Sequence, residues 1–404
     1  MKKNYFIIFL LLLNLSCLLK EKSELKPLFS IKIGFGTNEI GGSFERLNNK
    51  MFKVTYKDGF FYILDPINNK IMKVTEKGEV IFILFNGLDN PHIKEVNLQK
   101  TETEDFVIYT KLYRNFKIID PVLLEVDNKK NIYFINRDPE YKKMFENIGI
   151  KDQLILKFDS NGNFLNFIGT DGINSDPFSA ITELKVDNGN NLIVKENLDD
   201  GIYIYKFSED GKLLKKARLI KEDIPVLSSE MEYTVDFVDI KLSDFEDEVY
   251  VICQFIKSSI ENFSIIRYET MYEKIFVYSL RSNKYEKILF KVNPEFMDLT
   301  KISENRTIKS LYGDNKMIMK PMKEFIGVDL DSNIYLKDSE LPLTSAVFNK
   351  FSLNIYDFSG RNIRNIEVTY PEGIDYFSNF SVVKSGFVYS YYLKNGEIVF
   401  VKIK

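Results

Sequence analysis

A short strand–turn–strand unit recurs along the chain, and this repetition constrains the fold more than any other feature. The unit reads V-D-x-x-x-N-[IL] in three copies, VDNKKNIYF, VDNGNNLIV and VDLDSNIYL, which begin at Val126, Val186 and Val328. Looser copies begin at Val54, Leu242 and Val382. Asn and Gly in the turn tolerate the left-handed backbone of tight hairpins, and the flanking residues alternate as in pleated strands. We call the first residue of each copy the blade marker.

A second unit, I-x-K-[VF]-x-x-x-G, follows the first in several places. Copies begin at Ile71, Ile155 and Ile204, and related segments begin at Ile275 and Leu353. Each copy again joins two apolar strands through a polar turn with Gly. The 34 Phe and 23 Tyr, together with many Ile and Val residues, also favour strands over helices. The chain is therefore expected to be all-β.

The six blade markers predict a six-bladed β-propeller. Propeller repeats need about 40–50 residues, whereas neighbouring markers lie 54 to 86 residues apart. Some blades must therefore carry insertions, which we expect at Asn86–Asn115, Asp138–Asp152 and Asn293–Lys320. Within the second insertion, Pro139 to Gly149 predicts a short helix. Two alternatives remain open: a seven-bladed ring, and two all-β domains divided near Lys221–Glu232.

The two chain ends predict how the ring closes. After Val382 only three strands can be recognised, and the last of them is Glu397–Lys404. The segment Leu28–Gly34 reads as a strand that could supply the missing fourth one. Pairing it there would cover a sheet edge that otherwise invites aggregation. We therefore expect the N-terminal strand to complete the last blade.

The repeats resemble those of NHL-type six-bladed propellers. The segment ILKFDSNGNFLNFIGTDG, followed by PFSAITELKVDNGNNLIV, has the order of that family: a strand, an FD-x-NG turn, an IG strand end and then VD…GN. The clear match covers about Val122 to Leu214. Over its whole length the chain looks like the propeller-type lipoproteins of spirochaetes.

The first residues indicate export. Lys2 and Lys3 precede an apolar run from Tyr5 to Leu13, as in a signal peptide. The run is shorter than the roughly 20 apolar residues of a membrane-spanning helix. Ser16 directly before Cys17 resembles the bacterial lipobox, although Asn14 stands where that motif has an aliphatic residue.

That resemblance implies lipidation of the Cys17 thiol and a place on a bacterial membrane. We expect a signal peptide over residues 1–16, the lipidated cysteine and a tether over 17–27, and the propeller over 28–404. Because ten residues separate Cys17 from Leu28, the tether reaches at most about 35 Å, which favours the periplasmic side over the cell surface. A cleaved soluble protein and an uncleaved anchor are the alternatives.

The charge balance argues against one class of partner. The chain has 55 Lys and Arg against 58 Asp and Glu, with a net charge of −3. Without a basic excess we expect no nucleic-acid partner. No Cys/His cluster or Gly-rich phosphate loop is present, so no metal and no cofactor is expected.

Few residues offer covalent chemistry. His92, the only histidine, lies in a polar loop with no nucleophile nearby and is expected to be solvated. Cys253 lies in an apolar strand pattern, and we expect an inert, buried thiol without a disulfide to Cys17.

The recurrent carboxylates Asp127, Asp187 and Asp329 allow two interpretations. They could form a ring of ligands for a metal or sugar, or each could accept hydrogen bonds from its own turn, which we favour. Asp329 to Glu340 has the ligand spacing of an EF-hand loop, but Ile334 stands where that loop needs Gly. We therefore expect no calcium site.

The expected function is binding or interaction within the cell envelope, with a protein or glycan partner recognised by the insertions. The aromatic segment Asp105–Phe116 could line a binding rim or pack on the ring. The alternative function is a hydrolase or lyase for envelope glycans or peptides, which would use two carboxylates converging in the central funnel. A funnel of apolar and neutral side chains would favour binding.

Overall fold

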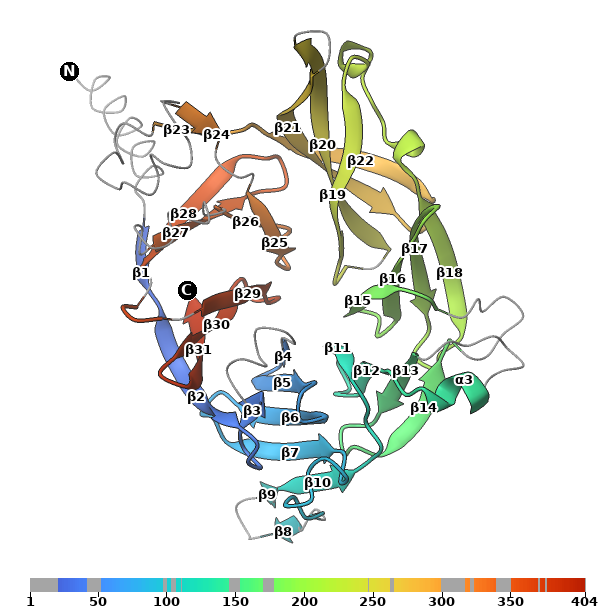
Figure 1. Cartoon of the computed structure of the whole chain (residues 1–404), viewed down its shortest axis with the longest axis vertical. Coiled ribbons are helices and arrows are strands. Elements are labelled where there is room, and N and C mark those ends of the chain that lie inside the picture. The colour runs from blue at the N-terminus through green and yellow to red at the C-terminus, as the bar shows by residue number, and fades with distance from the viewer. Residues whose placement is uncertain are drawn as a thin grey trace, which may run out of the picture.

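The computed structural model describes residues 21–41, 52–96, 100–102, 107–109, 111–144, 153–169, 178–245, 247–261, 265–298, 317–319, 323–338, 350–369, 371–374 and 376–403. Six of its eight sheets are arranged radially around a common axis (Figure 1), and each of the six is built on four antiparallel strands. This confirms the all-β, six-bladed propeller. The seven-bladed ring and the division into two domains are wrong.

The first three blades follow one another along the chain. Blade 1 comprises β4 (Lys53–Lys57), β5 (Phe60–Asp65), β6 (Lys70–Thr75) and β7 (Val80–Phe85). Blade 2 comprises β11 (Val122–Val126), β12 (Ile132–Asn136), β13 (Leu154–Phe158) and β14 (Phe164–Ile168). Blade 3 comprises β15 (Ile181–Val186), β16 (Leu192–Leu198), β17 (Gly201–Phe207) and β18 (Leu213–Leu219).

The other three blades complete the ring. Blade 4 comprises β19 (Thr234–Leu242), β20 (Glu248–Glu261), β21 (Ile265–Ser279) and β22 (Lys284–Val292). Blade 5 comprises β25 (Glu324–Val328), β26 (Ile334–Lys337), β27 (Lys350–Tyr356) and β28 (Asn362–Thr369). Blade 6 comprises β29 (Tyr376–Val382), β30 (Val388–Lys394), β31 (Glu397–Ile403) and β2 (Lys26–Gly34).

The core lies between the blades. One apolar cluster of described residues fills each of the six spaces between neighbouring blades. Strand β12 shows why its sequence is apolar throughout: Ile132 and Phe134 pack against blade 1, whereas Tyr133 and Ile135 pack against blade 3. Because side chains alternate between the two faces of a strand, a strand buried on both faces carries no polar alternation.

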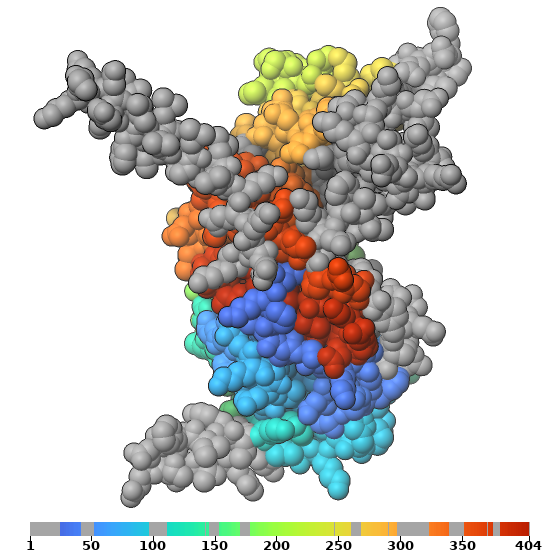
Figure 2. All heavy atoms as spheres, turned by 90° about the vertical axis from the view of Figure 1, so that its left-hand side faces the viewer, coloured from blue at the N-terminus to red at the C-terminus, as the bar shows by residue number. Residues whose placement is uncertain are grey.

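The N-terminal strand closes the ring, as expected. Strand β2 pairs antiparallel with β31, with Phe29 opposite Phe400. The Phe29 ring lies 4.6 Å from that of Phe400 and 5.1 Å from that of Phe61 in blade 1. Figure 2 shows β2, in blue, beside the C-terminal strands, in red. A short strand, β3 (Ile40–Gly41), extends this sheet beyond β2.

The described strands begin earlier in the chain than the sequence suggested. Strand β2 starts at Lys26, and Glu21–Glu24 forms β1, which pairs parallel with β28 at the outer edge of blade 5. Part of the expected tether is thus a strand. The physical reason is the free edge of β28, whose backbone groups need partners whatever the side chains. The segment from Glu21 to Gly34 therefore pairs with two neighbouring blades, with blade 5 through β1 and with blade 6 through β2.

The insertions gather at one end of the blades. The turns between the first and second strands of all six blades, and between the third and fourth strands of blades 1 to 5, have two to five residues. Antiparallel order puts all of these turns on the same face of the ring. All longer connections therefore fall on the opposite face, which we call the insertion face. There the first expected insertion forms the hairpin β8 (Lys100–Glu102)–β9 (Val107–Tyr109) and β10 (Leu112–Asn115), which pairs with β7.

The other two expected insertions also lie on the insertion face. The second contains α3 (Glu140–Met144), so the helix begins one residue after Pro139, and the third contains the hairpin β23 (Phe296–Asp298)–β24 (Met317–Met319). Lys221–Glu232, the alternative domain boundary, instead holds two short 3-10 helices, η2 (Lys221–Asp223) and η3 (Ser228–Glu230). In the part of the chain that the structure describes, no helix has the length and apolar character to cross a membrane.

Candidate functional site: the central channel

The inner strands β4, β11, β15, β19, β25 and β29 surround the axis of the ring (Figure 1), and we call the region that they enclose the channel. In blades 2 to 6 the side chain of the blade marker packs between its own blade and the preceding one. The residue before the marker points the other way, because successive side chains alternate. These residues differ from blade to blade and are Glu125, Lys185, Lys241, Gly327 and Ser381.

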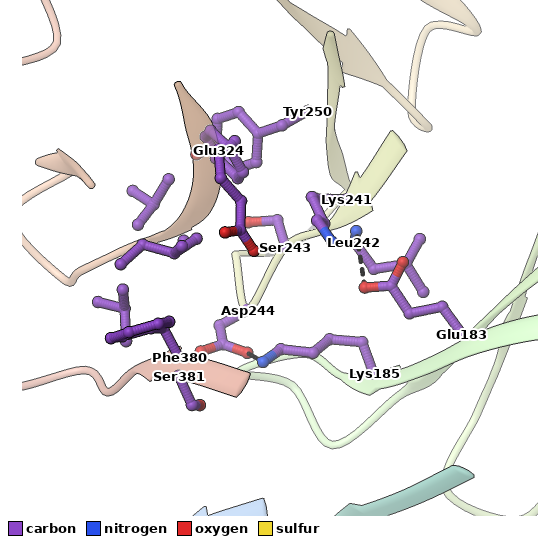
Figure 3. A pocket seen from close by; sticks show the side chains of 15 residues that line it. Glu183, Lys185, Lys241, Leu242, Ser243, Asp244, Tyr250, Glu324, Phe380 and Ser381 are labelled. Carbon is purple, nitrogen blue, oxygen red and sulfur yellow. Dashed lines mark hydrogen bonds and ion pairs between the residues drawn. The ribbon is translucent and has the colours of Figure 1, made fainter. Parts of the chain in front are cut away.

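A cavity of about 220 Å³ is lined by residues of blades 3, 4, 5 and 6. Figure 3 shows its two different walls. Strands β15 and β19 contribute Glu183, Lys185 and Lys241, and Asp244 follows β19. Strands β25 and β29 contribute Glu324, Phe380 and Ser381, together with the aliphatic residues Ile326, Val328 and Val382. The cavity has room for one small molecule, and charged groups of both signs line it.

Each carboxylate lining this cavity lies beside a lysine. The pairs are Asp244 with Lys185 at 2.8 Å, Glu183 with Lys195 at 2.8 Å, and Glu324 with Lys337 at 3.4 Å. Lys241 pairs in turn with Asp239 at 2.9 Å. Burial disfavours the charged form of Lys185, but Asp244 and then Glu125 outweigh it and hold its pKa above the usual value. These carboxylates are fixed as counterions.

Glu125 differs from the other channel carboxylates. It is buried, and among the described residues its carboxyl accepts one hydrogen bond, from the backbone N–H of Val126, 3.0 Å from Oε1. Burial raises the pKa of Glu125 to about 7, while Lys185 and Lys57 oppose that rise and Asp244 adds to it. Near neutral pH, small changes in the surroundings of this carboxyl therefore shift it between its protonated and its ionised form.

The channel is neither the apolar, neutral funnel expected for a binding protein nor the pair of free carboxylates expected for a hydrolase or lyase. It is not lined by apolar and neutral side chains, because charged groups of both signs face it. Nor do its carboxylates stand as a free acid–base pair, because Asp244 is held by Lys185. A glycosidase needs one protonated acid and one ionised carboxylate, both facing the substrate.

The recurrent aspartates serve their own turns. Asp127 Oδ1 accepts hydrogen bonds from the backbone N–H groups of Lys129 and Asn131, both at 2.8 Å, and Oδ2 accepts one from the Tyr133 hydroxyl at 3.1 Å. Asp329 repeats this arrangement with Asp331, Asn333 and Tyr335. The structural interpretation of these residues is confirmed.

Asp187 also accepts hydrogen bonds from its own turn, but a different side chain takes the place of the tyrosine hydroxyl. It accepts the N–H of Asn191 at 2.8 Å, but blade 3 has Ile193 where the other two copies have Tyr133 and Tyr335. Lys206, which lies opposite Ile193 on β17, supplies the missing contact at 2.8 Å from Asp187. The oxygens that an EF-hand would use at Asp329 are likewise occupied by backbone N–H groups and Tyr335.

The two candidates for covalent chemistry lie where the sequence placed them. His92 is exposed in the connection after β7. Cys253 lies on β20, fully buried and free, and burial raises the pKa of its thiol to about 12. Such a thiol has almost no thiolate at neutral pH and is unreactive. Cys17 lies outside the described residues. Among the described residues no group of three His, Cys, Asp or Glu side chains could hold a metal ion.

The last residues of the aromatic segment Asp105–Phe116 pack on the ring. Leu112 and Tyr113 are buried in the clusters on the two sides of blade 1, and the Phe116 ring lies 4.9 Å from that of Phe158. Beside it a groove of about 680 Å³ is lined by residues that include Phe85, Leu88, Pro91, Ile93 and Phe116. Leu88, at its rim, is 86% exposed.

Sequence reasoning missed Glu125 and the channel lysines. A signal was present, because Glu125, Lys185 and Lys241 all directly precede a blade marker. Charged residues next to an apolar strand position stand out once the markers are aligned. The pairs themselves join different blades, as Lys185 and Asp244 do, and linear spacing does not show such contacts.

No protein-family model matches this chain, and no curated protein matches it. Solved structures with a similar fold include a candidate gluconolactonase, with a TM-score of 0.41, 8% identity and coverage of 96% of this chain and 95% of that one. A member of the DUF4221 family from Bacteroides vulgatus has a TM-score of 0.38, 12% identity and coverage of 96% and 99%. A candidate exported protein from Bacteroides fragilis has a TM-score of 0.41, 12% identity and coverage of 95% and 98%. At these identities the likeness concerns the fold alone.

Proposed function

We propose that this protein is a lipid-anchored bacterial envelope protein of the NHL-like propeller type, which binds a protein or glycan partner. The observation that carries the binding role is the asymmetry of the ring. One face has turns of two to five residues in every blade, whereas the opposite face has all the long connections. Loops of variable length on a rigid scaffold are the usual means of recognition. The groove beside Leu88 belongs to the first of these insertions.

The state of the channel carboxylates supports binding over hydrolysis. Asp244, Glu183 and Glu324 each lie beside a lysine, and Glu125 is buried. A carboxylate held by a lysine is a weaker base than a free one. A hydrolase or lyase would need at least one of these pairs to open.

The proposed anchor rests on the sequence around Cys17. Lys2 and Lys3, the apolar run and the Ser16–Cys17 pair support lipidation of the thiol. Because β1 begins at Glu21, Cys17 can lie at most about 14 Å from it. A lipid at Cys17 would hold the outer edge of blade 5 close to a membrane, on the periplasmic side in our proposal.

Two measurements test this proposal separately. Cells are labelled with a palmitate analogue, and the native protein is compared with Cys17→Ala. We expect labelling of the native protein only, and equal labelling of both would refute the anchor. For the partner, a photocrosslinking residue replaces Leu88, with the exposed Leu214 on the outer strand β18 as the control site. One partner captured at position 88 and absent at 214 supports the proposal, and the same products at both sites refute recognition by this insertion.

A further inference from the structure

The outer edges of the six blades differ from one another. In the part of the chain that the structure describes, an additional strand covers the outer edge of blades 5, 1 and 6, formed by β1, β10 and β3. The outer strands of blades 2, 3 and 4 pair only with the strand inside them. Strand β14 reads FLNFI and has no charge, whereas β18 reads LLKKARL and β22 reads KYEKILFKV. Lysine on a free edge strand protects against aggregation, but β14 does without it, so this protection alone does not explain the lysines of β18 and β22.

The exposed lysines of β22 have no carboxylate partner. They are Lys284, Lys287 and Lys291. Among the described residues, no carboxylate lies within ion-pair distance of any of them. The one carboxylate on the strand is Glu286, which accepts a hydrogen bond from the Ser282 hydroxyl at 2.9 Å. Glu248 lies within electrostatic range of Lys287 but is not paired with it. Strand β22 therefore presents a positive charge that no ion pair compensates.

Aromatic rings hold two of these lysines in place. The Nζ atom of Lys287 lies 3.5 Å from the centre of the Phe358 ring, and that of Lys291 lies 3.5 Å from the centre of the Tyr272 ring. Such a cation–π contact positions an ammonium group but does not neutralise it. Both ammonium groups can therefore still attract an anion, and they lose little conformational freedom when they bind one.

The positive charge continues onto the neighbouring outer strand β18. The Lys215 ammonium donates a hydrogen bond to the backbone oxygen of Arg281, in the turn before β22, at 2.8 Å. No carboxylate of the described residues lies within ion-pair distance of Lys215, or of the exposed Lys212 just before β18. The Arg281 side chain is 82% exposed and lies 3.6 Å from Asp247, which also binds Lys206. We call the following residues the basic rim: Lys212, Lys215, Arg281, Lys284, Lys287 and Lys291.

The basic rim lies next to the blade that the N-terminal segment covers. Strand β1 pairs with β28 of blade 5, and Phe358, which Lys287 contacts, lies in the turn that leads into β28. Because Cys17 can lie at most about 14 Å from Glu21, a membrane that holds a lipid at Cys17 would lie beside the rim. Blade 1, which carries the groove of the first insertion, is on the opposite side of the ring from blade 4 (Figure 1). That groove would stay clear of the membrane.

We propose that the basic rim binds the anionic headgroups of the membrane. A membrane suits this site better than a compact anion does, because the cations follow the outer edges of two blades and do not converge on one point. A lipid chain and a cluster of basic residues together hold a protein on a membrane more stably than one signal alone. The position of the rim beside the anchor rests on the lipidation proposed above, whereas its attraction for anionic lipid does not and is tested without the lipid.

The test uses full-length protein that carries Cys17→Ala, so that no acyl chain contributes. The protein is sedimented with vesicles of phosphatidylcholine alone and with vesicles that also contain about 30% phosphatidylglycerol. Any contribution from the apolar run near the N-terminus is common to both kinds of vesicle. At low salt the anionic vesicles should bind more protein, and the difference should disappear at high salt, because salt screens exposed charges. Equal binding to both kinds of vesicle at low salt would overturn the proposal.

Variants assign the effect to the rim. Replacing Lys284, Lys287 and Lys291 together by Gln should lower the preference for anionic vesicles at least tenfold, since each basic residue near such a surface raises the affinity about fivefold. The matched control replaces three exposed lysines of blades 6 and 1 by Gln, and these are Lys32, Lys77 and Lys94. It removes the same number of charges and should keep the preference. Circular dichroism confirms that each variant is folded. An equal loss in both variants would overturn the assignment to the rim.

The orientation on the vesicle gives a second readout. In the Cys17→Ala protein a fluorophore is attached at Ser282→Cys, beside the rim, or at Leu88→Cys on the insertion face, because the buried Cys253 does not react. Brominated lipid in the anionic vesicles should quench the label at position 282 and not the one at 88. Equal quenching at both positions would overturn the placement. Binding of dextran sulfate without a preference for anionic vesicles would overturn the membrane as the partner and assign the rim to an acidic polymer. Palmitate labelling at Cys17 is unaffected by these outcomes and judges the proposed anchor independently.

Discussion

Glu125 should make the stability of the propeller depend on pH in a way that one substitution removes. Burial raises the pKa of its carboxyl from 4.5 to about 7, so the folded state favours the protonated form. The contribution of Glu125 to the free energy of unfolding is largest below about pH 4.5, where the carboxyl is protonated in both the folded and the unfolded protein. It is lost as the pH rises towards 7, because the unfolded chain ionises first. A pKa difference of about 2.5, at about 1.4 kcal/mol for each pH unit, amounts to about 3 kcal/mol.

Glu125→Gln keeps the size of the side chain and cannot ionise. Its free energy of unfolding should match that of the native protein near pH 4.5 and exceed it by up to about 3 kcal/mol at pH 8. The assay is urea unfolding of the full-length protein in detergent at a series of pH values, followed by circular dichroism. Glu372→Gln, at an exposed position, is the matched control and should show no such trend. A difference between Glu125→Gln and the native protein that stays constant from pH 5 to pH 8 would refute the reasoning, and would mean that Lys185 and Lys57 compensate the buried charge in full.

Three further outcomes follow from the packing. Phe29→Ala should cost about 3–5 kcal/mol of unfolding free energy in urea, because its ring packs between the last and first blades, whereas Phe296→Ala at a 54% exposed position should stay within about 0.5 kcal/mol; equal effects would count against closure by β2. Cys253 should react with a thiol reagent at pH 8 only after unfolding, since burial raises its pKa to about 12; rapid modification of the folded protein would contradict this. Lys206→Met should destabilise the protein by about 3–5 kcal/mol, because it leaves buried Asp187 without its cation, and a loss below about 1 kcal/mol in urea unfolding would show that Asn191 alone satisfies Asp187.

The sequence sufficed for the ring because each repeat is a local signal. Every blade marker stands in the inner strand of a blade, and the strand expected at Leu28–Gly34 does close the ring. Strand β1 could not be foreseen, because Glu21–Glu24 is short and charged and lacks the pattern of a strand. It forms because β28 offers a free backbone edge, which depends on the assembled blade.

The channel was harder to predict because its contacts join residues far apart in the chain. Lys185 meets Asp244 only after blades 3 and 4 have packed together. The residue types were visible in the sequence. Their pairing, and therefore which charges remain uncompensated, depends on the tertiary structure.

The positions where the blades agree and the positions where they differ have separate roles. Where the blades agree, the residues hold the blade together: Asp127 and Asp329 bind their own turns, and blade 3, which lacks the tyrosine, replaces its contact with Lys206. Because blade 3 supplies another donor where the tyrosine is missing, we infer that this contact to the aspartate is needed for folding. The residues before the blade markers show no such replacement, and they change from Glu125 to Lys185 to Gly327 around the ring. Folding does not require these differences, since each blade forms with a different residue there. In a propeller built from one repeated unit, it is therefore the departures from the repeat around the channel, rather than its recurrent aspartates, that are free to determine what the protein binds.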